Sequence, residues 1–131
     1  MGNVLFVCKY NRFRSKVAQA YFNKINSDKS IHVRSAGLIK GDPVDSSLKK
    51  FAEKFGLKLK VSTSPLSEEL FRWVDIIVNV ADNVPTPTFN QAINHGKKLI
   101  RLEVHDGERG QDLSPIIKEI ITKVDNLVKR I

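Results

Sequence analysis

The chain has 131 residues, a length typical of one domain and sufficient to bury a hydrophobic core. Its residues are 41% hydrophobic and 27% charged, which excludes general disorder, and its net charge of +8 favours anionic partners. One cysteine excludes an internal disulfide and a zinc site built on several thiolates, and no apolar run is long enough to cross a membrane. These observations predict a single cytoplasmic domain over 1–131 that does not cross a membrane. We further expect a monomer with no metal, cofactor or nucleic-acid partner.

Strands and helices are expected to alternate along the chain. Strands are predicted over 3–8, 31–35, 75–80 and 98–104, each a short run rich in β-branched residues. Helices are predicted over 15–26, over 43–55 with Asp42 as the cap, from Ser67, over 89–95, and from a cap at Ser114 to Ile131. Residues 83–88, with two prolines, are expected to be irregular. This alternation predicts a three-layer α/β/α fold, a parallel sheet with helices on both faces.

The most informative segment joins the first strand to the first helix. Cys8 ends the strand, five residues follow, and Arg14 and Ser15 open the helix. Backbone N–H groups of such a loop and of a helix start converge on one point, which suits an oxyanion such as phosphate or sulfate. The guanidinium of Arg14 can clamp two of its oxygens.

The same positive field favours the ionised form of Cys8, and a thiolate beneath a bound phosphoryl group can form a phosphocysteine. A lone cysteine at a buried strand end is more often an inert packing residue. The spacing to Arg14 and the position at the carboxyl end of a strand, where ligands bind in open α/β sheets, favour the functional interpretation.

With these motifs, the chain resembles the low-molecular-weight protein tyrosine phosphatase family, whose fold the thioredoxin-coupled arsenate reductases share. The resemblance rests on VLFVCKYNRFRS at 4–15, VRSAGL at 33–38, GDPVD at 41–45 and VDIIVN at 74–79. It implies the family's flavodoxin-like α/β fold with a four-stranded parallel sheet. It also implies hydrolysis of phosphotyrosine or other aryl phosphates, in a protein or a small molecule, with no cofactor. By this resemblance, the phosphate is held by the loop residues Lys9, Tyr10, Asn11, Arg12, Phe13 and Arg14.

By the same resemblance Cys8 is the nucleophile, Asn11 holds the loop in its unusual conformation, and Ser15 hydrogen-bonds the thiolate. The family's general acid is an Asp in the loop after the fourth strand, which Asp106 matches best. Two fallbacks for the acid are Asp112 and Glu108, and Asp106 can also be read as a simple turn residue beside a glycine.

The sequence also departs from the family pattern. Tyr10 replaces a small residue, Lys16 and Gly107 replace prolines, and Glu108 and Arg109 stand where an aromatic pair grips the phosphotyrosine ring. The aromatic substitutes for that pair are Tyr10, Phe13 and Trp73, each more typical of packing. The loop has three other basic residues, Lys9, Arg12 and Lys16. The first interpretation is that they form a solvated rim. The second is that they attract acidic or multiply phosphorylated substrates.

We predict a phosphatase that acts through Cys8, and we keep two alternatives. One is a non-catalytic oxyanion-binding module of the same fold. The other is an arsenate-reductase-like protein that uses an external thiol, since the chain has no second cysteine to form the disulfide. The three histidines have no metal-like spacing; they are His32, His95 and His105.

Overall fold

The computed structural model describes residues 2–107 and 111–131. The strands are β1 (Asn3–Cys8), β2 (His32–Gly37), β3 (Ile76–Ala81) and β4 (Lys98–Val104). The helices are α1 (Arg14–Ile25), α2 (Ser46–Glu53), α3 (Glu68–Trp73), α4 (Asn90–Asn94) and α5 (Ser114–Val128), with a 3₁₀ turn η1 (Thr86–Phe89) before α4. No helix in these two ranges is long and apolar enough to span a membrane.

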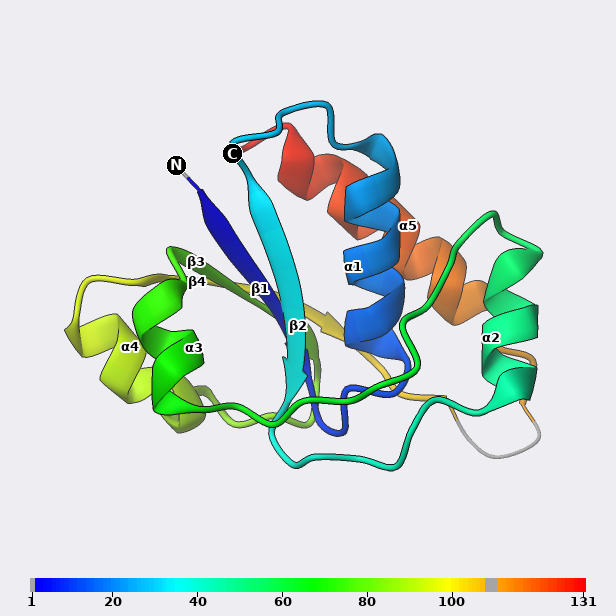
Figure 1. Cartoon of the computed structure of the whole chain (residues 1–131), viewed down its shortest axis with the longest axis horizontal. Helices are drawn as coiled ribbons and strands as arrows, with labels where there is room; N and C mark the ends of the chain where they lie inside the picture. Colours follow the sequence, from blue (N-terminus) through cyan, green and yellow to red (C-terminus); the bar gives the residue numbers. More distant parts are fainter. Residues whose placement is uncertain (1, 108–110) are drawn as a thin grey trace.

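The four strands form one parallel sheet in the order β2-β1-β3-β4, which confirms the predicted architecture (Figure 1). The two central strands, β1 and β3, are buried along almost their whole length, as their continuous apolar sequences require. Because all four strands run the same way, the segments that follow β1, β3 and β4 meet at one edge of the sheet.

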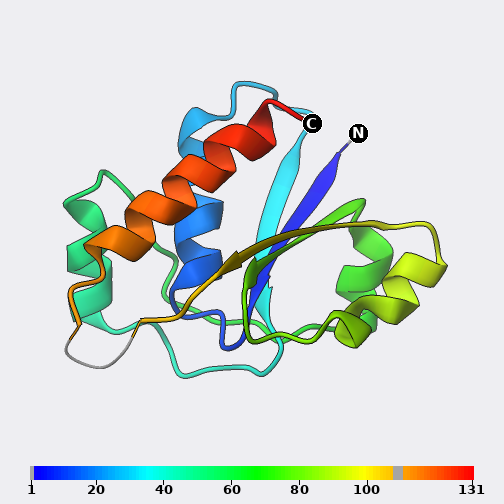
Figure 2. The ribbon, with the colours of Figure 1, turned by 180° about the vertical axis from the view of Figure 1, so that it is seen from behind.

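Helices cover both faces of the sheet (Figures 1 and 2). One face carries α1, α2 and α5, which pack on side chains such as Phe6 and Val78. The other face carries α3, η1 and α4 around Leu5, Ile77 and Phe89. This arrangement confirms the three-layer fold.

Two helix starts differ from the prediction. Helix α2 begins after Asp45, not Asp42, because the Asp45 carboxylate accepts the Leu48 N–H at 3.0 Å. Helix α5 begins at Ser114 itself, whose N–H donates to Asp112 at 3.0 Å, and it ends at Val128 rather than at Ile131. In both cases the N–H group at the helix start donates to an aspartate near the predicted cap. Several residues near each helix start have side chains that can accept such a bond, so the sequence alone does not select one.

Residues around the proline-rich segment also differ slightly from expectation. The stretch predicted to be irregular ends in the 3₁₀ turn η1, where Pro87 lies in the first turn, and the helix predicted over 89–95 is limited to α4.

The Phe22 ring on α1 is fully buried against Phe6 of β1, with ring centroids 5.8 Å apart. We expect Phe22→Ala to lower the free energy of unfolding by about 3–5 kcal/mol, because it leaves a cavity at the main helix–sheet contact. Ile39→Ala, at a side chain that is 51% exposed, should cost less than about 0.5 kcal/mol. Urea denaturation of both variants measures the difference, and equal losses would contradict this assignment of the core.

Candidate active site

The site begins at the carboxyl end of β1, where Cys8 is only 3% exposed. The chain then bends through 9–13 and enters α1 at Arg14. The Cys8 Sγ lies 3.0 Å from the Ser15 Oγ, so the hydroxyl can donate to a thiolate. The pairing of sulfur and hydroxyl that the sequence predicted is therefore present in the structure.

Asn11 holds the loop in a conformation that few side chains tolerate. Its φ is 56°, in the left-handed region, where asparagine is one of the better-tolerated residues. Its amide donates to the Ser15 Oγ at 2.8 Å, and its Oδ1 accepts the Ser64 N–H at 3.0 Å. Because Asn11 is completely buried, these two bonds fix the loop between α1 and the segment before α3.

Gly37, at the end of β2, lets the loop lie against the neighbouring strand. A Cβ at this position would lie 2.8 Å from the Asn11 N and 2.6 Å from the Ile39 carbonyl oxygen, closer than side-chain carbons approach. The VRSAGL motif thus ends in a glycine because backbone occupies the space that a side chain would need.

The backbone N–H groups of Lys9, Tyr10, Asn11, Arg12 and Phe13 donate to no other group in the part of the chain that the structure describes. Most buried amides in proteins are paired, so a run of unpaired donors in a fixed loop is typical of an anion-binding site. This observation agrees with the cradle that the sequence predicted for a tetrahedral oxyanion.

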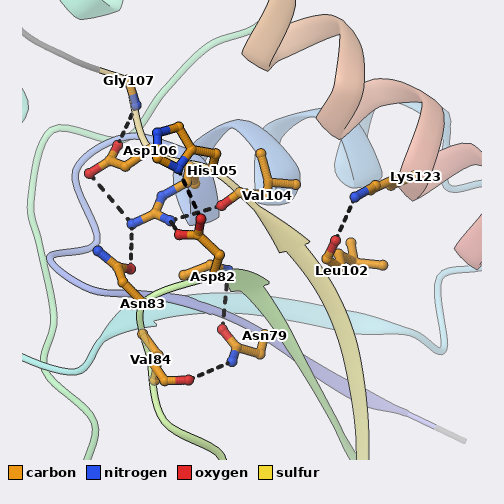
Figure 3. Close-up of polar contacts among 12 residues, drawn as sticks. Asn79, Asp82, Asn83, Val84, Leu102, Val104, His105, Asp106, Gly107 and Lys123 are labelled. Carbon is orange, nitrogen blue, oxygen red and sulfur yellow. Dashed lines mark hydrogen bonds and ion pairs between the residues drawn. The ribbon is translucent and has the colours of Figure 1, made fainter.

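Arg14 is 2% exposed and reaches across the sheet edge to the segments after β3 and β4. Its guanidinium donates to the Val104 carbonyl and to Asn83 Oδ1, both at 2.9 Å. Asp82 Oδ1 lies 3.4 Å away and Asp106 Oδ2 lies 3.5 Å away. Figure 3 shows Asn83, Asp82, Val104 and Asp106 lying close together around this guanidinium. The candidate phosphate clamp and the candidate acid are therefore in direct contact.

Asp82 and Asn83 contact Arg14 in the candidate site, and the sequence analysis missed them. Their turn is shaped by Asn79, which is 2% exposed, accepts the Ala81 N–H at 3.1 Å and donates to the Val84 carbonyl at 3.1 Å (Figure 3). The signal that could have identified the turn was its position, because polar residues directly after a central parallel strand lie at the edge where ligands bind.

A cleft of about 490 Å³ opens above the loop. Cys8 and Arg14 lie in its lining together with Asp106. Two further walls come from α2, through Leu48, and from the start of α5, through Leu113. These apolar walls were not predicted, because α2 and α5 approach the loop only in the folded chain.

The two fallback acids have different positions. Asp112 does not line the cleft, and the Ser114 N–H that it accepts lowers the pKa of its carboxyl, which opposes the protonated form that an acid needs. Glu108, and with it Arg109, lies outside the described residues. Asp106 itself is 45% exposed at its side chain and accepts the Gly107 N–H at 3.0 Å.

The prediction of a solvated basic rim is wrong for Lys16. This lysine is 4% exposed and donates to the Ser62 carbonyl, because the first turn of α1 faces inward. Arg12 is partly buried and donates to the carbonyls of Asp42 and Pro43 at 3.0 and 3.3 Å, with Asp45 at 3.5 Å.

The aromatic substitutes separate into two groups. Tyr10 lies at the mouth of the cleft, 41% exposed, and Phe13 lines it while packing into the core. Trp73 is at the opposite end of the sheet, where its carbonyl accepts from Asn3 and its ring lies 4.5 Å from the Arg34 guanidinium carbon. It therefore cannot contact a ligand above Cys8.

The histidines do not converge on a metal site. His105 Nδ1 lies 2.9 Å from Asp82 Oδ2, and His95 Nδ1 lies 2.7 Å from the Gln91 carbonyl. Within residues 2–107 and 111–131, no three His, Cys, Asp or Glu side chains are grouped to hold a metal ion.

Comparison with known proteins identifies a family and a shared fold. The family model described as low molecular weight phosphotyrosine protein phosphatase matches residues 3–120. A search of curated proteins found no match.

Solved structures with the same fold are named for different activities. A low molecular weight protein tyrosine phosphatase from Streptococcus pyogenes, SP-PTP, has a TM-score of 0.84 at 17% identity, over 100% of this chain and 93% of that one. The YwlE arginine phosphatase from Geobacillus stearothermophilus has a TM-score of 0.79 at 19% identity, over 98% and 91%. The thioredoxin-dependent arsenate reductase Cg_ArsC1' from Corynebacterium glutamicum has a TM-score of 0.76 at 25% identity, and this chain spans only 61% of it while 99% of this chain is covered.

We expect Asn11→Ala to destabilise the protein more than Asn11→Gly. Both substitutions remove the bonds to Ser15 and Ser64, but only alanine must also be strained at the observed φ of 56°, which adds about 1 kcal/mol. Thermal and urea unfolding measure the difference. If the two variants were equally stable, the backbone conformation at Asn11 would not carry the role given to it here.

The pKa of Lys16 is lowered by burial and then by the nearby charge of Lys60, although Cys8 acts in the opposite direction. Between the lowered pKa and the ordinary value of 10.5, the unfolded chain binds the proton more tightly than the folded chain. The stability of the wild type relative to Lys16→Met should therefore rise with pH across this window.

Urea denaturation at several pH values measures this trend, with Lys58→Met at an exposed lysine as the matched control. A stability difference for Lys16→Met that does not change with pH would contradict the prediction.

Proposed function

The chain belongs to the low molecular weight phosphotyrosine protein phosphatase family, and on that premise we propose that it hydrolyses aryl phosphomonoesters through a phosphocysteine intermediate. The observation that carries the proposal is the combination at one cleft of Cys8, the unpaired loop amides and Arg14, with Asp106 3.5 Å from the guanidinium. This set supplies a nucleophile, an oxyanion site and a carboxyl group at the same position.

In the first step, the loop amides and Arg14 hold the three non-bridging oxygens of the phosphoryl group. The Cys8 thiolate attacks phosphorus, the bond from phosphorus to the leaving oxygen breaks, and Asp106 gives its proton to that oxygen. The products are the free alcohol and a phosphoryl group bonded to Cys8.

In the second step, the Asp106 carboxylate takes a proton from water, and the resulting hydroxide attacks phosphorus. The sulfur–phosphorus bond breaks, inorganic phosphate leaves, and the sulfur returns to the thiolate. The Ser15 hydroxyl, 3.0 Å from the Cys8 Sγ, stabilises the departing thiolate by a hydrogen bond.

The cleft walls favour a substrate with a flat apolar body. Leu48 and Leu113 line the cleft and the Tyr10 ring is exposed at its mouth, which supports an aryl phosphate such as phosphotyrosine. The partners proposed are therefore a phosphorylated protein or a small aryl phosphate, with phosphate or sulfate as competing anions.

Arsenate reduction is the second chemistry that the fold supports, because a structure at 25% identity is a thioredoxin-dependent arsenate reductase. After Cys8 binds arsenate through sulfur, a second thiol attacks that sulfur and forms a disulfide with it. The sulfur–arsenic bond breaks and leaves its electron pair on arsenic, so As(V) becomes As(III) while the two thiols are oxidised. The chain has one cysteine, so the second thiol would have to come from a separate molecule.

Hydrolysis of para-nitrophenyl phosphate in mildly acidic buffer tests the proposal. Cys8→Ser should abolish turnover, and Arg14→Ala should lower kcat by about 100- to 1,000-fold. Asp106→Asn should lower kcat by about 100- to 10,000-fold for poor leaving groups and much less for good ones, which need little protonation. Asp112→Asn is the matched control and should leave kcat unchanged.

The outcomes separate the proposals. Phosphate binding without turnover by the wild type would favour a non-catalytic oxyanion-binding module. Arsenate reduction supported by thioredoxin or a small thiol, without phosphatase activity, would favour the reductase. Comparison of phosphotyrosine with phosphoarginine peptides would identify which phosphorylated residue the protein hydrolyses, since one structural neighbour is named an arginine phosphatase.

A further inference from the structure

A second hollow of about 500 Å³ lies between α1, β2, α3 and the segment 60–67. It shares no lining residue with the cleft at Cys8. Figure 1 shows the segment that connects α2 to α3 crossing α1 and β2 on its way to α3. The hollow therefore lies beside β2, an edge strand of the sheet.

Three cations line this hollow: Lys16, Lys60 and Arg34. None of them forms an ion pair with a carboxylate among residues 2–107 and 111–131. Lys16 and Lys60 are close enough for one to lower the pKa of the other, after the larger effect of burial. Two neighbouring ammonium groups repel each other, so an anion between them would be stabilised.

The surrounding structure holds two of these three cations in place, Lys16 and Arg34, whereas Lys60 is exposed. Lys16 donates to the Ser62 carbonyl, and the Arg34 guanidinium carbon lies 4.5 Å from the centre of the Trp73 ring. Hydroxyl donors in the lining include Ser62 and Ser64. Fixed cations beside hydroxyl groups are the donors that a phosphate group requires.

One carboxylate, Glu69, also lines the hollow, so its formal charge is three positive against one negative. Glu69 forms no ion pair with the described cations. A carboxylate in this position repels an anion, and this gives the test a substitution that should strengthen binding.

We propose that this hollow is a second oxyanion site, which binds a doubly charged phosphate or phosphoryl group between Lys16, Lys60 and Arg34. The site is linked to the loop of the first site, because the Ser64 N–H donates to Asn11 Oδ1 and Lys16 directly follows Ser15. A ligand here contacts the segment that supports Asn11.

Titration of the ¹⁵N-labelled protein with inorganic phosphate, at constant ionic strength, tests the proposal by NMR. Two groups of amides should shift with separate saturation: those of 9–14 for the first site, and those of Arg34 and 60–67 for the second. Lys60→Ala should weaken binding at the second group by about fivefold or more and leave the first within about twofold. Glu69→Gln should strengthen binding at the second group.

Lys58→Ala, at the exposed lysine two residues earlier, removes the same charge outside the hollow and should change neither group. Arg34→Ala is an independent second variant, which should weaken the second group only. The proposal is overturned if the amides of 60–67 show no saturable shift, or if Lys58→Ala weakens their binding as much as Lys60→Ala, which would indicate diffuse attraction.

A phosphoserine peptide, added to the Cys8→Ser variant, distinguishes the source of the anion. Tighter binding of the peptide than of inorganic phosphate at the amides of 60–67 would assign the site to a phosphorylated protein. Equal or weaker binding would assign it to free phosphate. Each readout is binding, so the result does not depend on whether the protein hydrolyses aryl phosphates.

Discussion

The site depends on the hydrogen bonds that Asn11 makes in a left-handed backbone conformation. With its amide on the Ser15 hydroxyl and its carbonyl oxygen on the Ser64 N–H, Asn11 joins the loop to the first helix on one side and to the edge of the sheet on the other. The backbone N–H groups of residues 9–13 in this anchored loop have no acceptor among the described residues. A loop held in this way meets an anion without further reorganisation, which is the condition for strong electrostatic binding.

The parallel sheet and the position of the loop were predictable because they rest on local signals. The apolar run ending at Cys8 and the spacing to Arg14 each occur within a few residues, and in a parallel sheet such strand ends lie at one edge. The role of Asn11 in the loop was implied by the family resemblance, and its φ of 56° agrees with that role. Helix starts were less certain, because Asp42 and Asp45 are equally good caps when only their sequence is considered.

The remaining features of the site depend on distant contacts. The acceptors that Arg14 finds after β3 have no local motif, and the inward direction of Lys16 follows from how the first turn of α1 packs, not from its charge. Apolar walls such as Leu48 and Leu113 come to the cleft only through the arrangement of α2 and α5 in the folded chain. Where a side chain could face either the core or the cleft, the tertiary structure decides its environment. Local sequence patterns do not determine that choice.

The hydrogen bond from Arg14 to the Val104 carbonyl joins residues that are 90 positions apart. Such a bond forms only after β1, β3 and β4 have aligned, because the entropy of closing so long a loop must be offset by the sheet first. A nascent or partly unfolded chain therefore carries a cysteine but lacks the enclosure around it. Under the proposed function, the reactivity of that sulfur toward phosphate esters reports completion of the whole sheet.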